Sequence, residues 1–199
     1  MNNKFDKAID IYKQMESDGY AHVDLYINLA NAYLGLKPSK KYPQEIIRSA
    51  LRESIQKGIN QGSASLDQSY SLWYARLQSD QRDGDIDSQI LVCMKLIENA
   101  TTISRQILAN MMLATCFYSQ GRLQEASEVI AEVLELDPNN KQARKLDSTI
   151  KSISDYLTDE EYYKGEGEIK SEELDGLDSD FFQLEALDQA GHLIESDIE

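Results

Sequence analysis

The sequence has little proline, phenylalanine and histidine, and it has no long apolar segment. Its 199 residues include 3 Pro, 4 Phe and 2 His. The longest apolar runs are a few residues long, whereas a membrane-spanning helix needs roughly 20. Few segments alternate Val, Ile or Thr with polar residues, which makes an all-β fold a poor interpretation. We therefore expect a helical protein without membrane insertion.

The first residues, MNNKFDKAID, contain no apolar core of a secretory signal. We therefore expect a reducing compartment, the cytoplasm or alternatively the nucleus. The two cysteines, Cys93 and Cys116, each lie in an apolar helical pattern. We expect both to be small buried hydrophobic residues, with a disulfide or redox pair as the alternative.

The motifs that carry common chemistry are also absent from the sequence. His22 and His192 have no partner at a metal-ligand spacing. The stretch from Ser79 to Ile90 has Gly84 where a calcium loop needs glycine, but it lacks acidic residues at the first, third and twelfth positions. No phosphate loop or nucleophile elbow occurs. We expect no catalytic residues, no metal and no cofactor.

Basic residues are dispersed, and Lys37, Lys40 and Lys41 form the only local cluster. Nucleic-acid binding needs a concentrated basic face. A solvated loop is the better interpretation of these lysines, so we expect no nucleic-acid partner.

The net charge of −15 is concentrated at one end of the chain. Residues 158–199 contain fifteen acidic residues and two lysines, so the rest of the chain is nearly neutral. Low hydrophobicity with high charge predicts a largely disordered acidic tail. Within the tail, residues 179–190 could form a short helix that docks on a partner or on the protein itself, or they could carry only incidental apolar residues. The apolar residues of this tail motif are Phe181, Phe182, Leu184 and Leu187.

Residues 113–140 follow the period of two short helices. Leu113, Ala114 and Phe117 form one apolar stripe, and Gly121 interrupts it. A second stripe follows at helical spacing, and residues 137–140 close it with turn-forming residues. The second stripe consists of Ala126, Val129, Ile130, Val133 and Leu134. This pattern predicts an antiparallel helix pair.

The helix pair resembles the tetratricopeptide repeat (TPR), a 34-residue helix–turn–helix unit. Ala114, Gly121, Ala126 and Pro138 fall at positions eight, fifteen, twenty and thirty-two of that repeat. The N-terminal part has the same resemblance, since Ala8, Tyr12 and Met15 match a second helix, and Leu29, Ala30 and Tyr33 match the first helix of the next repeat. The first helix in the chain is therefore either a lone cap or part of a longer stack.

The middle of the chain departs from the pattern. Residues 37–44 are predicted to form an inserted loop, and a helix over 44–57 should point Ile46, Ile47, Ala50, Leu51 and Ile55 inward. Residues 66–81 and 86–100 predict a degenerate helix pair, in which Leu77 and Asp80 stand where a small residue and an aromatic are expected, so its register stays open. The last helix, over 141–157, is expected to cap the stack. Its apolar residues are Ala143, Leu146, Ile150, Ile153 and Leu157.

The fold class expected is all-α. The resemblance implies a right-handed TPR-like superhelix of antiparallel helix pairs over residues 1–157, with a C-terminal capping helix. We expect about three pairs plus the lone N-terminal helix, followed by the acidic tail at 158–199.

The resemblance also implies a groove lined by the first helix of each pair. The groove positions carried over to this chain are Asp24, Ile27, Asn28, Asn31, Leu34, Leu108, Met111, Thr115 and Tyr118. Alternatively, Leu108, Met111 and Tyr118 only pack against a neighbouring helix. A mixture of apolar, amide and hydroxyl groups suits a peptide or helix of another protein.

Three functional interpretations remain open, and none is an enzyme. The first is a TPR adaptor or scaffold that binds a protein segment in its groove. The second is an assembly chaperone whose acidic tail shields a basic client. The third is an adaptor inhibited by its own tail. The sequence leaves the oligomeric state open.

Overall fold

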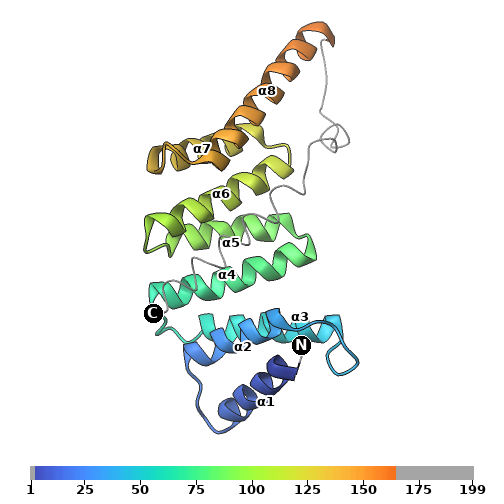
Figure 1. The fold of residues 1–199 in the computed structure, drawn as a ribbon, viewed down its shortest axis with the longest axis vertical. Helices are drawn as coiled ribbons and strands as arrows, with labels where there is room; N and C mark the ends of the chain where they lie inside the picture. The colour runs from blue at the N-terminus through green and yellow to red at the C-terminus, as the bar shows by residue number, and fades with distance from the viewer. Residues whose placement is uncertain (1–2, 165–199) are drawn as a thin grey trace. The chain divides into compact units, whose positions relative to one another are not determined.

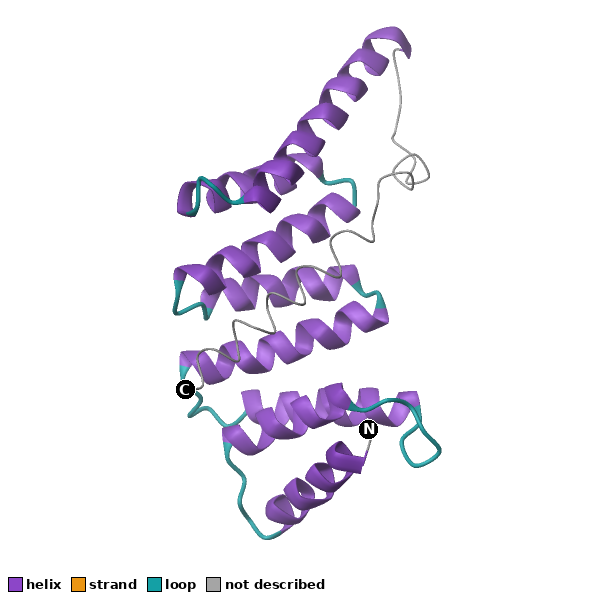
Figure 2. Cartoon of the chain, in the orientation of Figure 1, coloured by secondary structure: helices purple, strands orange, loops and turns teal. Residues whose placement is uncertain are grey.

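In the computed structural model, which describes residues 3–164, every regular element is an α-helix (Figure 2). The all-α prediction is therefore confirmed for this part of the chain. The eight helices found there are α1 (Asn3–Ser17), α2 (Val23–Gly35), α3 (Gln44–Ile59), α4 (Leu66–Asp83), α5 (Ile86–Glu98), α6 (Ile103–Ser119), α7 (Leu123–Leu136) and α8 (Lys141–Lys164). None of these helices is long and apolar enough to cross a membrane.

The chain divides into two compact units, residues 1–106 and residues 107–199. In the first unit, α1 packs on α2, and the pairs α2/α3 and α4/α5 lie side by side (Figure 1). Ile9 of α1 and Leu72 of α4 have no exposed surface, so both helices contribute to the core of this unit. Apolar burial of this kind supplies most of the stability of short helices.

Local sequence fixes where α4 and α5 begin and end. Ser65 and Gln68 form a reciprocal capping box at the start of α4. Gly84 ends α4 with a φ of 70°, a conformation that costs an L side chain energy but suits glycine. Asp85 then accepts a hydrogen bond from the backbone of Ser88 and caps α5.

A glycine also sets the approach of α3 to its neighbours. A Cβ atom at Gly58 would lie 2.8 Å from Leu72 and 3.2 Å from Tyr26. Both distances are shorter than ordinary carbon–carbon contacts. Gly58 therefore lets α3 approach α4 and α2 closely.

The loop between α2 and α3 is anchored, although its lysines are exposed as expected. Tyr42 is 6% exposed and belongs to the core, and its backbone N–H donates to Ser39 Oγ at 3.1 Å. Lys41 lies 3.3 Å from Asp10 of α1 and 4.9 Å from the ring centre of Tyr42. The inserted segment is thus tied to α1 and to the core.

One inward residue of α3 was predicted wrongly. Ile47, Leu51 and Ile55 are buried, but Ile46 is 53% exposed. These three residues recur every four positions and define one face of α3. Ile46 lies beside that face, toward solvent. Ala50, at its edge, is partly buried.

In the second unit, α7 and α8 pack against each other. Ala114 of α6 and Ala126 of α7 both have no exposed surface, and Gly121 between them has a φ of 71°. The amphipathic pattern predicted for the last helix is confirmed, because its first apolar residues are buried against the fold. Those residues are Ala143, Leu146 and Ile150. The helix continues to Lys164, beyond the expected boundary at residue 158.

Candidate functional site

The degenerate pair α4/α5 is held by a buried carboxylate. Asp80 has no exposed surface. Its Oδ2 accepts hydrogen bonds from Arg76 Nε at 2.8 Å and from Ser88 Oγ at 2.6 Å, and Arg52 Nη2 of α3 lies 3.5 Å from Oδ1. These donors compensate the cost of burying a charge. Asp80 therefore joins α3, α4 and α5 at the position where an aromatic residue was expected.

A second carboxylate extends this connection along α3. Asp83 forms ion pairs with Arg48 at 2.6 Å and with Arg52 at 2.9 Å. Arg52 thus lies between two carboxylates of α4, and the polar residues at the end of α4 hold the helix against α3.

The first helices α2 and α4 are adjacent and parallel. At their starts, Gln68 Nε2 donates to Asp24 Oδ1 at 2.7 Å. Near their ends, Arg82 Nη2 donates to the carbonyl oxygen of Leu34 at 2.9 Å. Contacts from start to start and from end to end require the two helices to run in the same direction. They therefore present a common outer face.

The start of α6 is joined to the start of α4 in the same manner. Asp67 accepts from Thr101 Oγ1 at 2.7 Å and forms an ion pair with Arg105. These two donors lower the pKa of Asp67, Thr101 having the larger effect. The Arg105 guanidinium lies 4.8 Å from the ring centre of Tyr70, whose pKa is raised by burial. Arg105 and Thr101 are therefore held at the start of α4, as Asp24 is.

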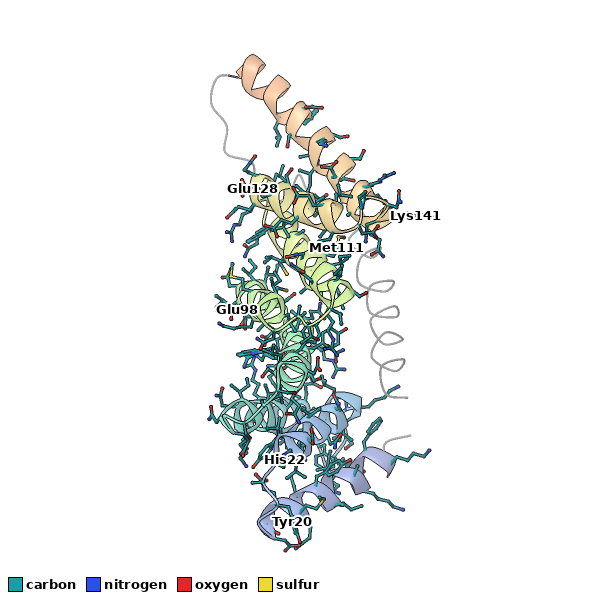
Figure 3. The ribbon with its side chains drawn as sticks, turned by 90° about the vertical axis from the view of Figure 1, so that its left-hand side faces the viewer. Tyr20, His22, Glu98, Met111, Glu128 and Lys141 are labelled. Atoms are coloured by element: carbon teal, nitrogen blue, oxygen red, sulfur yellow. The ribbon has the colours of Figure 1, made fainter. Side chains whose placement is uncertain are left out.

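The predicted groove residues of α2 differ in their accessibility. Asn28 and Asn31 are exposed, and neither side chain hydrogen-bonds to any described residue. Ile27 and Leu34 are half-buried, beside the buried core of α2. Asp24 is exposed but already hydrogen-bonded to Gln68, and its carboxylate lies 3.3 Å from the imidazole of His22. Figure 3 labels His22, which caps α2. The open amides and the two half-buried aliphatic residues are the available groups on this helix.

The predicted groove residues of α6 are more enclosed. Met111, labelled on α6 in Figure 3, is only 8% exposed. Thr115 Oγ1 donates to the carbonyl oxygen of Met111 at 2.8 Å, and Leu108 and Tyr118 are half-buried. Burial raises the pKa of Tyr118. Leu108, Thr115 and Tyr118 thus keep accessible surface. The tail motif of Phe181, Phe182, Leu184 and Leu187 lies outside the described residues.

Groove positions on α4 were not predicted from the sequence. Gly84 follows α4 as Gly121 follows α6, with nearly equal positive φ values, 70° and 71°. If Gly84 is given the repeat position of Gly121, the positions of α4 equivalent to the predicted groove are Ser71, Tyr74, Gln78 and Gln81. Tyr74 among them is only 6% exposed and belongs to the core. Gly84 is the sequence signal from which these positions could have been predicted.

A small cavity between α1, α2 and α3 does not resemble a cofactor site. Its volume of about 60 Å³ has room for a few water molecules. Its charged groups neutralise one another, since Lys57 lies 2.8 Å from Glu16 and 2.9 Å from Glu53. Among the described residues, no group of three or more His, Cys, Asp or Glu side chains could hold a metal ion. Cys93 and Cys116 are both buried, as predicted.

Comparison with known families gives one match within this chain. The model of the tetratricopeptide repeat matches residues 108–140, which comprise most of α6 together with α7 and the turn after it. No curated protein matches the chain. The family match and the eight helices of the described part together fit a tetratricopeptide-like repeat protein.

Proposed function

We propose that the protein is an adaptor that binds an extended segment of a partner protein along the outer face of its first helices. Tetratricopeptide repeats are typically non-catalytic modules for protein–protein interaction, and the match to this family supports such a role here. The observation that carries the proposal is the parallel alignment of α2 and α4, fixed by the Asp24–Gln68 and Leu34–Arg82 contacts. Two parallel helices offer a continuous track for a peptide.

The side chains on this track suit a peptide backbone. Asn28 and Asn31 are exposed and have no hydrogen-bond partner in the described part of the chain. An amide side chain both donates and accepts, which matches the N–H and C=O groups of an extended peptide. Ile27 and Leu34 lie beside these amides and would contact apolar side chains of the ligand. The predicted ligand is therefore an extended segment with alternating apolar residues.

The groove positions of α6 extend the same chemistry in the second unit. Leu108 and Tyr118 keep partly exposed apolar surface, and Tyr118 has a hydroxyl group at its end. Tyrosine is enriched in binding surfaces because it combines a large apolar ring with a polar tip. We assign these residues to a partner-binding surface of the second unit, considered by itself.

A peptide-display selection on the full chain tests the proposal. Peptides selected from a random library should lose roughly tenfold in affinity for Asn31→Ala, the loss expected for one hydrogen bond of about 1.4 kcal/mol. Leu91→Ala is the matched control, because Leu91 is 65% exposed on α5, a second helix. Equal affinity losses for both variants, or losses for the control alone, would exclude the α2 face as the binding site.

A further inference from the structure

The outer face of α1 carries exposed apolar residues. Ile11 is 59% exposed and Met15, one turn later, is 39% exposed, while Ile9 on the opposite face is fully buried. Residues spaced by three and four lie on one helix face, so Lys4 and Lys7 share the face of Ile11 and Met15. The face therefore combines two lysines in its first half with two apolar residues in its second half.

The two lysines of this face have no acidic partner among the described residues. Neither Lys4 nor Lys7 forms an ion pair there. Two acidic residues of α1 are already paired with lysines elsewhere in the unit, Asp10 with Lys41 at 3.3 Å and Glu16 with Lys57 at 2.8 Å. Cations near a helix N-terminus are also unfavourable because the helix dipole is positive there. An acidic partner would relieve this repulsion.

A segment of the same chain has the complementary character. From Ser171 to Glu199 the sequence contains no lysine or arginine. Within residues 179–190, Phe181, Leu184 and Leu187 recur at helical spacing and are bordered by acidic residues. The bordering acids are Asp180, Glu185 and Asp188. Apolar residues interspersed with acids therefore complement a helix face that combines lysines with apolar residues.

We propose that residues 179–190 dock as an amphipathic helix on the outer face of α1 of the same chain. Phe181, Leu184 and Leu187 contact Ile11 and Met15, and the acidic residues pair with the lysines. The α1 face exposes little apolar area, so a separate chain would bind it weakly. A covalent tether raises the effective concentration of the segment to the millimolar range, which makes a small interface sufficient. This inference is independent of the proposed binding track on α2.

Hydrogen exchange on the full chain, read by mass spectrometry, tests this docking. Amides of residues 179–190 should exchange roughly tenfold more slowly than in an unstructured peptide. The double variant Ile11→Ser/Met15→Ser should remove that protection, and Lys4→Glu/Lys7→Glu should reduce it. Because all four side chains are exposed, the amides around Ile9 should stay protected in both variants, which shows that α1 remains folded.

The control is Leu91→Ser/Met94→Ser, which removes an equally exposed apolar pair from α5. It should leave the protection of residues 179–190 unchanged. High salt should reduce the protection in the wild type, because the lysine–carboxylate pairs are exposed.

Four results would overturn the proposal. The first is exchange of residues 179–190 at the unstructured rate in the wild type. The second is protection that the α1 variants do not change. The third is protection lost on Leu108→Ser/Tyr118→Ser, which would place the segment on the α6 groove positions. The fourth is protection that rises with protein concentration together with a doubled mass, which would identify a second copy as the source.

Discussion

Asp80 and Arg76, four residues apart on α4, form an ion pair of 2.8 Å in which the carboxylate has no exposed surface. Ser88 of α5 and Arg52 of α3 complete the surroundings of this carboxylate. The same position of a tetratricopeptide repeat is expected to hold an aromatic side chain. Here hydrogen bonds and charge connect the helices that aromatic packing would otherwise connect.

Removing this carboxylate should destabilise the first unit strongly. Asp80→Ala removes the acceptor shared by Arg76 and Ser88 and leaves Arg52 with Asp83 alone. Breaking a buried pair costs about 3 kcal/mol. Urea unfolding followed by the fluorescence of Trp73, the single tryptophan, measures the free energy of unfolding of this unit.

The matched control for this variant is Glu98→Ala. Glu98 forms an exposed ion pair with Lys95 on α5. Exposed pairs contribute little, so the free energy of unfolding should barely change. Similar values for Asp80→Ala and Glu98→Ala would contradict the structural role of the buried carboxylate.

Adding a methyl group at Gly58 should also destabilise the first unit. A Cβ there would meet a terminal methyl of Leu72 at 2.8 Å, so this fully buried side chain would have to shift within the core. Overpacking of this kind costs roughly 1–3 kcal/mol, more than alanine gains from its higher helix propensity. Ser49→Ala, at an exposed position of α3, is the control and should be neutral or slightly stabilising. A Gly58→Ala protein as stable as the wild type would show that the helices are loosely packed.

The attachment of α1 to α3 should weaken in acid. The hydrogen bond from Lys57 is the main cause that lowers the pKa of Glu16, and Tyr26 contributes a further hydrogen bond at 3.1 Å. A carboxyl group whose pKa is lowered by folding stabilises the folded state at pH values above the ordinary pKa of glutamate. This stabilisation is lost as the pH falls through the lowered pKa. At neutral pH the wild type should therefore be more stable than Glu16→Gln.

Urea unfolding at a series of pH values checks this expectation. The stability difference between wild type and Glu16→Gln should be constant near neutrality, and it should shrink and then disappear as the pH falls through the lowered pKa of Glu16. Glu45→Gln, at an exposed position of α3, should differ little from the wild type across the series. A difference for Glu16→Gln that persists unchanged in acid would mean that the Lys57 contact does not depend on the charge of Glu16.

The helices could be predicted largely from apolar periodicity and turn residues. Ala114, Gly121 and Ala126 recur at the spacing of a known repeat, and the structure places them in buried helix positions and at a left-handed turn. The pattern was sufficient here because each position has a local physical requirement for a small or flexible residue.

Other features depend on contacts between distant residues. Asp80 is buried because Arg52, twenty-eight residues earlier, supplies a compensating charge, and no local pattern shows this pairing. No groove positions were predicted on α4, because Asp80 stands where the repeat pattern expects an aromatic residue and the register of the helix pair was therefore left open. Ile46 was misplaced because two adjacent isoleucines both fit an apolar stripe, and only the packing of Ile47 decides between them.

The central claim, that the first-helix face binds a partner protein, is tested most directly by site-specific photo-crosslinking. A photoreactive amino acid placed at Asn31 or at Leu91 of the full chain would be activated in cells that express the protein. One or a few defined protein adducts are expected from the Asn31 position, and a selected groove peptide should abolish them. None of these adducts is expected from the Leu91 position. The same adducts from Leu91, or their absence from Asn31, would contradict this claim.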